Sequence, residues 1–308
     1  MWVYLIRRVF VVSTLVIVGV SVLTFSMLHL VPGDPVRLMY GRTQVSAETL
    51  EIVRHQLGLD LPLPVQYFRY VSRVLTGDLG RSVRSQRPVA EELLARAPAT
   101  FLLAAVAMLI SVAAGLPLGL LSALHRGKAL DRLSMVLALL GVSVPQFWLG
   151  LALILVFAVG LNWLPVSGVG SGKGLILPAV TLGLAETGLM ARLFRSSMLD
   201  VMGEPYLVAA RAKGASRRRV IAVHALRNAL IPVVTIIGLE SGYLLAGSVI
   251  AEVVFARPGL GSLAVDAILN RDFPVVQGVV LFTSVTFVSL NSFVDILYAF
   301  IDPRIRLG

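Results

Sequence analysis

Cysteine is absent from this 308-residue chain, and charged side chains are scarce. Without a thiol, the protein has no disulfide, no thiolate metal site and no cysteine nucleophile. Its four histidines are scattered and lack the spacing of metal ligands. Only 14% of the residues are charged, whereas a soluble domain has about a quarter. We therefore expect no metal site, and the low charge argues against an ordinary soluble protein. The histidines are His29, His55, His125 and His224.

Apolar residues are abundant, at 57% of the chain, and the mean hydropathy is +0.86. This is more apolar surface than one globular core can bury, so lipid is expected to surround much of the chain. Six stretches are long enough to cross a hydrocarbon core about 30 Å thick, which takes about 20 helical residues. The composition therefore predicts an all-α integral membrane protein with six transmembrane helices. The stretches are residues 9–30, 99–124, 133–160, 175–199, 229–251 and 275–301.

Basic residues beside these stretches predict the orientation, because cytoplasmic loops of membrane proteins are enriched in Lys and Arg. They gather at four places, which all fall on one side of the membrane if both termini are cytoplasmic. We attribute the net charge of +10 to this orientation and to anionic lipid, not to nucleic acid. The residues are Arg7 and Arg8; Arg126, Lys128 and Arg132; Arg211, Lys213, Arg217, Arg218, Arg219 and Arg227; and Arg304 and Arg306.

Three regions follow from this topology. Residues 1–31 form an N-terminal tail and the first span, which we expect to stay uncleaved because its apolar run is long and no signal-peptide cleavage site follows. Residues 32–98 form an extracytoplasmic segment with two amphipathic helices, one between Ser46 and Gly58 and one over 65–75. Residues 99–308 form a core with the five remaining spans.

The loop after the fourth span, residues 204–228, is the most informative part of the chain. Its pattern predicts a short helix over 206–213, a left-handed residue at Gly214 and a second helix over 217–227 capped by Ser216. A basic segment broken by glycine cannot enter lipid and is too short to be a domain. We interpret it as a docking element and not as an ordinary basic loop. The expected docking residues are Tyr206, Ala209, Ala210, Arg211, Lys213, Gly214, Ser216, Arg217 and Arg218.

Short motifs follow one another in a fixed order along nearly the whole chain. They include Pro32-Gly33-Asp34-Pro35, Gly77-Asp78-Leu79-Gly80, Ala209-Ala210 with Gly214, Asn228-Ala229-Leu230-Ile231-Pro232, Glu252-Val253-Val254-Phe255, Arg271-Asp272 with Pro274, and Asp302-Pro303-Arg304. This order resembles the permease subunits of bacterial ATP-driven importers of the dipeptide, oligopeptide and nickel type. Val208 and Arg227 depart from the general importer motif, which has Glu and Pro there, but the peptide type tolerates both.

The resemblance implies a type I importer permease fold in the bacterial cytoplasmic membrane. It also implies half of a translocation pathway for peptides, coupled to ATPases through the cytoplasmic Ala-x-x-x-Gly loop. The implied partners are a second, related permease, two ATPase domains that bind ATP and Mg²⁺, and an extracytoplasmic substrate-binding protein. Nickel chelates, glutathione and haem stay open as alternative substrates.

The glycine-rich run at residues 168–174 does not form a phosphate-binding loop. Such a loop needs Gly where Ser167 stands and Ser or Thr where Gly174 follows Lys173. We therefore expect the chain to hold no cofactor and no catalytic residue, with ATP and Mg²⁺ bound by partner subunits. The sequence shows no nucleophile paired with a base, so it gives no sign of an intramembrane enzyme.

Carboxyl groups inside membrane spans are costly and usually face a helix bundle or a wet cavity. Glu186, Glu240 and Asp295 are of this kind and are candidate residues of the substrate pathway, where a carboxylate can attract a peptide's amino group. A protonated or Arg-paired Glu within the bundle is the alternative, and Asp295 with Asn291 also suits subunit packing. The same carboxylates leave open a secondary transporter driven by an ion gradient. A membrane component of a sensor is a further alternative.

Three further features have structural interpretations. Pro117 and Pro145 fall within predicted spans, where they permit kinks. Arg192 and Arg195 lie near the inner end of the fourth span and can snorkel to the interface. The amphipathic stretch 260–268 either packs on the rim of the bundle or faces a gate or a binding protein.

Overall fold

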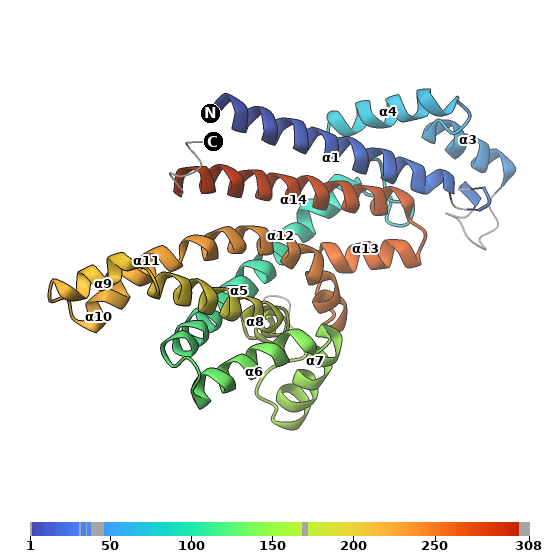
Figure 1. The fold of residues 1–308 in the computed structure, drawn as a ribbon. Helices are drawn as coiled ribbons and strands as arrows, with labels where there is room; N and C mark the ends of the chain where they lie inside the picture. Colours follow the sequence, from blue (N-terminus) through green and yellow to red (C-terminus); the bar gives the residue numbers. More distant parts are fainter. Residues whose placement is uncertain (1, 31, 35, 38–45, 168–171, 302–308) are drawn as a thin grey trace. The chain divides into compact units, whose positions relative to one another are not determined.

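The computed structural model describes residues 2–30, 32–34, 36–37, 46–167 and 172–301 (Figure 1). Within these ranges the regular structure is helical, with one isolated bridge between Arg81 and Pro88. Five helices are long and apolar enough to cross a membrane, and a bent pair makes a sixth span if it is counted as one. The prediction of an all-α membrane protein is confirmed. Pro35, residues 168–171 of the glycine-rich run, and Asp302, Pro303, Arg304 and Arg306 lie outside the described residues.

The third predicted span is broken at Pro145. Helix α6 (Ala129–Ser143) ends before it, and α7 (Gln146–Leu153), which continues as the π-helix η1 (Ile154–Gly160), leaves at an angle of 102°. Proline has no amide hydrogen for the helix ladder and pushes the preceding residue into an extended conformation, as seen at Val144 with ψ 124°. The predicted kink at Pro145 is confirmed, whereas Pro117 lies within the continuous helix α5 (Val89–Leu124).

The chain folds into two compact units. The first holds residues 1–100 and 258–289, and the second holds residues 101–257 and 290–308. Helices α5 and α14 (Phe273–Ile301) contribute residues to both units. The two units are described separately below.

The core of the first unit forms where α13 (Leu260–Leu269) meets the first turns of α5 and α14. Leu260 and Leu263 of α13 are buried against Leu93 of α5 and Val275 of α14. The Leu260 amide donates to the Thr100 hydroxyl at 2.8 Å. The stretch 260–268 therefore packs against the bundle through one face, while Ile268 on the other face stays 59% exposed.

The segment predicted to be extracytoplasmic carries both predicted helices, α3 (Ala47–Leu57) and α4 (Leu63–Leu75). Gly58 ends the first helix with a φ of +69°. Helix α4 starts two residues before the predicted position. Its proline lies in the first turn, where backbone amides have no partner within the helix, so no helical hydrogen bond is lost. Helix α1 (Trp2–Leu30) is tied to α4 by polar side chains along its C-terminal half. The bonds join Ser21 to Tyr67 at 2.8 Å, Thr24 to Tyr70 at 2.9 Å and His29 to Gln66 at 2.9 Å.

The second unit is built around α8 (Ile176–Met202). Helices α6, α7 and α12 (Ile231–Val254) all pack on it. Small residues allow a close approach: a Cβ added to Gly188 of α8 would lie 2.0 Å from the carbonyl oxygen of Ala138 on α6. Helix α8 is therefore the helix on which the others of this unit pack.

Candidate functional site

The predicted docking segment, residues 204–228, forms a sharp corner. Helix α9 (Pro205–Ala212) is followed by α10 (Arg217–Arg219), the π-helix η3 (Val220–Ala225) and α11 (Leu226–Ala229). Gly214 has a φ of +86°, a left-handed conformation that closes the C-terminus of a helix. Its amide donates to the Arg211 carbonyl at 2.9 Å, and the Ser216 hydroxyl accepts from the Arg219 amide. The predicted corner and cap are confirmed.

The inner side of this corner is anchored in a core of apolar side chains. Leu207 of α9, Val220 of η3 and Ala225 are each no more than 1% exposed. They pack with Phe194 and Met198 of α8. Tyr206 adds a polar tie, because its hydroxyl accepts from the Asn228 side chain at 2.6 Å. Since both arms rest on α8, the corner is fixed to one of the membrane-spanning helices.

The outer side of the corner is exposed. Eight of the nine predicted docking residues lie on the surface, and Ala210 is half-buried against the core. Val208, where the general importer motif has an acid, is 64% exposed. The four predicted basic residues form no ion pair with any described residue. They are Arg211, Lys213, Arg217 and Arg218. Figure 1 shows α9, α10 and α11 together, at one end of the second unit.

A partly buried ion pair that sequence reasoning missed ties the start of α6 to α8. Arg195 donates from Nε to Asp131 Oδ1 at 2.8 Å and from a terminal nitrogen to Oδ2 at 2.9 Å. Asp131 is 5% exposed and also accepts from the Ser122 hydroxyl and the Gly127 amide. Arg195 therefore does not snorkel as predicted, because its partner lies on the neighbouring helix. Arg192, one turn earlier, is exposed.

Two of the three candidate carboxylates come together. Glu186 on α8 and Glu240 on α12 lie close enough to interact, and both are half-buried. Neither forms an ion pair with a described Arg or Lys, so the Arg-paired alternative is not found in the described part of the chain. Two neighbouring carboxyl groups make an acceptor-rich site between α8 and α12.

Asp295, the third candidate, is exposed on the surface of α14. Its neighbours Phe293 and Ile296 are 62% and 40% exposed. One turn before it, the side-chain oxygen of Asn291 is buried without a hydrogen-bond partner among the described residues. No group of three or more His, Asp or Glu in the described ranges is arranged to hold a metal ion.

Comparison with known proteins identifies the family. The sequence profile of the binding-protein-dependent transport system inner membrane component matches residues 115–307. The profile of the N-terminal part of such membrane components matches residues 1–104. The chain belongs to this family. It is the permease subunit of an ABC importer and lies in the inner membrane, crossing it several times.

Close relatives of the permease are similar over almost its whole length. It is 47% identical over 304 residues to the glutathione transport system permease protein GsiC of Salmonella paratyphi A, and equally so to GsiC of Escherichia coli K12. Each match covers 98% of both chains. These relatives are transport permeases and not enzymes. Family membership overturns the secondary-transporter and sensor alternatives.

Solved structures of importers share the fold of the permease. The MetNI methionine ABC transporter, in an inward-facing conformation, matches with a TM-score of 0.59 and 19% identity over 68% of this chain and 96% of that chain. An amino acid ABC transporter solved with histidines matches with a TM-score of 0.54 and 15% identity over 74% of this chain and 97% of that chain. The type I importer permease fold is therefore confirmed.

Proposed function

We propose that this permease forms half of the translocation pathway of an ATP-driven importer of peptides, with glutathione as the first substrate to test. Glutathione is itself a small peptide, and the 47% identity to permeases named for its transport supports this choice. The peptide interpretation also rests on the ordered motifs that the sequence shares with peptide-type permeases.

The partners in this proposal are a second, related permease, two ATPase domains with ATP and Mg²⁺, and an external binding protein. The chain itself contributes no ATP chemistry, because its one glycine-rich run departs from the phosphate-loop pattern. The second permease lies against the Asp295 surface of α14. Phe293 and Ile296 are exposed beside the exposed Asp295, so this surface offers a partner both apolar contacts and a polar group.

One observation carries the coupling role: the corner at Gly214 is buried on its inner side and exposed on its outer side. The basic outer surface meets acidic or carbonyl groups of an ATPase. When ATP draws the two ATPases together, the movement is transmitted through Leu207 and Val220 to α8. The movement of α8 then changes the side of the membrane to which the pathway is open. Docking and conformational change are then connected by one packed core.

The test of docking is co-purification of the ATPases with variants of the permease. Ala209→Glu places a charged, larger side chain on the exposed face, whereas Ala210 is a poorer choice because it is half-buried. Gly214→Pro cannot adopt a φ of +86° and lacks the amide that bonds Arg211. Both variants are expected to lose the ATPases at normal membrane levels.

The matched control is Ala129→Glu. Ala129 is also exposed, at the start of α6, and the charge distribution predicts that it lies on the same side of the membrane. This variant is expected to retain the ATPases. Full retention by both Ala209→Glu and Gly214→Pro would refute the docking role.

The Glu186–Glu240 pair is proposed to receive the cationic amino group of the substrate. Its support is the absence of a cation near either carboxyl group among the described residues and their closeness. Changing both to Gln is expected to lower uptake of glutathione in reconstituted vesicles, with ATPase co-purification unchanged. N-acetylated glutathione is the discriminating probe, because removal of its amino charge should abolish the difference between wild type and variant. Equal uptake of glutathione by both proteins would contradict this role.

A further inference from the structure

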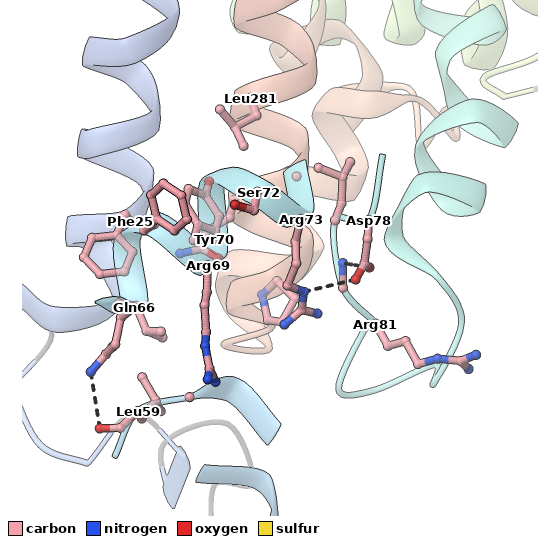
Figure 2. A pocket seen from close by; sticks show the side chains of 18 residues that line it. Phe25, Leu59, Gln66, Arg69, Tyr70, Ser72, Arg73, Asp78, Arg81 and Leu281 are labelled. Atoms are coloured by element: carbon pink, nitrogen blue, oxygen red, sulfur yellow. Dashed lines mark hydrogen bonds and ion pairs between the residues drawn. The ribbon is translucent and has the colours of Figure 1, made fainter. Parts of the chain in front are cut away.

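A cavity of about 420 Å³ lies within the first unit (Figure 2). Residues of α1, of α4 and the turn that follows it, and of the start of α14 line it. Neither the docking corner nor the carboxyl pair is part of it. Its chemistry is therefore independent of the proposed coupling and substrate sites.

One wall of the cavity is cationic. Arg69, Arg73 and Arg81 line it together with a single acid, Asp78. The Arg73 Nε donates to Asp78 at 3.0 Å, and the Gly80 amide donates to the same carboxyl group at 2.9 Å. These bonds, that of Gly80 first, lower the pKa of Asp78 below its usual value of 3.8, so it is charged at neutral pH and compensates Arg73.

One acid does not balance three arginines, although Arg81 also lies close enough to Asp78 to help lower its pKa. Arg69 has no hydrogen bond or ion pair with any described residue. Arg81 donates only to the neutral carbonyl of Gln86, at 3.0 Å. Both side chains are exposed. The cavity wall therefore carries a net charge of about two, which favours an anionic ligand.

The opposite wall is apolar and continues onto the surfaces of membrane-spanning helices. Phe25 and Leu28 of α1 and Leu281 of α14 line the cavity. Leu23 and Leu30, on either side of this part of α1, are 68% and 78% exposed. A ligand with one negatively charged end and apolar chains would contact both the basic and the apolar wall, whereas a small soluble anion would bind only the basic wall.

The cavity lies where two spans end. Leu28 is two residues from the end of the span Val11–Leu30, and Pro274 is the second residue of the span Phe273–Ile296. Ends of spans lie at the level of lipid headgroups, and basic pockets at that level are typical of anionic lipid recognition. We propose that this cavity binds an anionic phospholipid, with its phosphate on Arg69, attracted at longer range by the charge of Arg81, and its acyl chains along α1 and α14.

The test is native mass spectrometry of the full-length permease in neutral detergent with added phosphatidylglycerol or phosphatidylethanolamine. Phosphatidylglycerol should bind preferentially, and Arg69→Gln with Arg81→Gln should weaken that binding about tenfold or more, since bonds to charged groups are lost. Arg87→Gln is the matched control, because Arg87 is exposed in the same segment but does not line the cavity. Unchanged phosphatidylglycerol binding by the double variant would overturn the proposal.

A soluble probe separates the lipid from other anions. Glycerol phosphate carries the phosphate without acyl chains and should compete only weakly; equal competition would overturn the lipid assignment in favour of a soluble anion. Leu28→Trp keeps the arginines and fills the apolar side of the cavity. It is the alternative test variant if the double arginine variant does not fold. Wild-type lipid binding by Leu28→Trp would also count against the proposal.

Discussion

Asp272 has a structural role that explains one of the shared sequence motifs. Its carboxylate accepts from the Ser82 hydroxyl at 2.6 Å and from the amides of Val83 and Arg84 at 3.3 Å. The side chain is 5% exposed and lies directly before α14. A single residue therefore fastens the turn at 82–84 to the start of a membrane-spanning helix.

Replacing Asp272 should destabilise the first unit. In Asp272→Ala the buried Ser82 hydroxyl loses its acceptor, which costs about 1–3 kcal/mol. The measurement is the midpoint of thermal unfolding in detergent, which is expected to fall. Asp266→Ala is the control, because Asp266 is exposed on α13 and its side chain has no bond with a described residue. An equal midpoint for both variants would show that the Asp272 bonds contribute nothing.

Local residue patterns predict conformations that depend only on nearby residues. The left-handed conformation of Gly214 and the cap at Ser216 follow from a helix end and a helix start within a few positions. The pairing of Asp131 with Arg195 joins residues 64 positions apart, and helical spacing does not distinguish Arg195 from Arg192. The approach of Glu186 to Glu240 likewise depends on how α8 packs on α12, which sequence periodicity does not specify.

At the scale of helices, the ion pair between Asp131 and Arg195 fixes how α6 and α8 meet. Asp131→Asn leaves Arg195, whose side chain is 27% exposed, without its counter-charge, and the lost charged hydrogen bonds cost about 1–3 kcal/mol. Asp131→Asn should therefore lower the thermal unfolding midpoint, and the exposed Arg192→Gln should not. A double change, Asp131→Asn with Arg195→Gln, should be less harmful than the sum of the single changes. Strict additivity would show that the two residues do not interact.

Close packing of α6 on α8 gives a second prediction for these helices. A methyl group at position 188 would collide with the Ala138 carbonyl oxygen, which belongs to the backbone and cannot rotate away. Gly188→Ala should cost about 1–3 kcal/mol through overpacking, again measured by thermal unfolding. Gly19→Ala on α1 is the matched control, since no atom lies within 4 Å of the added group, and it should be neutral or slightly stabilising. A neutral Gly188→Ala would mean that the helices can separate without cost.

Hydropathy located the spans but not their shapes. The third predicted span, residues 133–160, has uniform apolar character, yet its two halves diverge by 102° around Pro145. The sequence indicated a kink there, but its size depends on how α6 and α7 each pack on α8. Pro117 shows the converse, because a proline within an apolar run lies in a continuous helix.

For the molecule as a whole, the Lys and Arg distribution and the ordered motifs sufficed to predict a multi-pass importer permease. The division into two units could not be predicted, because residues 258–289 join residues 1–100 across more than half of the chain. That arrangement depends on α13 burying its apolar face against α5 and α14. Apolar periodicity marks such a face but does not identify the helix that covers it.

Transport by the whole complex should depend on the docking corner. In vesicles that contain both permeases, the ATPases and the binding protein, Ala209→Glu is expected to lower ATP-driven uptake about tenfold or more, since one unfavourable buried charge at an interface costs several kcal/mol. Ala129→Glu should transport normally. Normal uptake by Ala209→Glu, at equal amounts of inserted protein, would contradict coupling through this surface.

The space around Gly214 has a consequence for its chemistry. No atom lies within 4 Å of a Cβ built there, yet its φ is +86°. The restriction at this position is thus one of handedness and not of size. A D-alanine introduced by semisynthesis would adopt that backbone geometry without strain, whereas L-alanine would be strained at this positive φ.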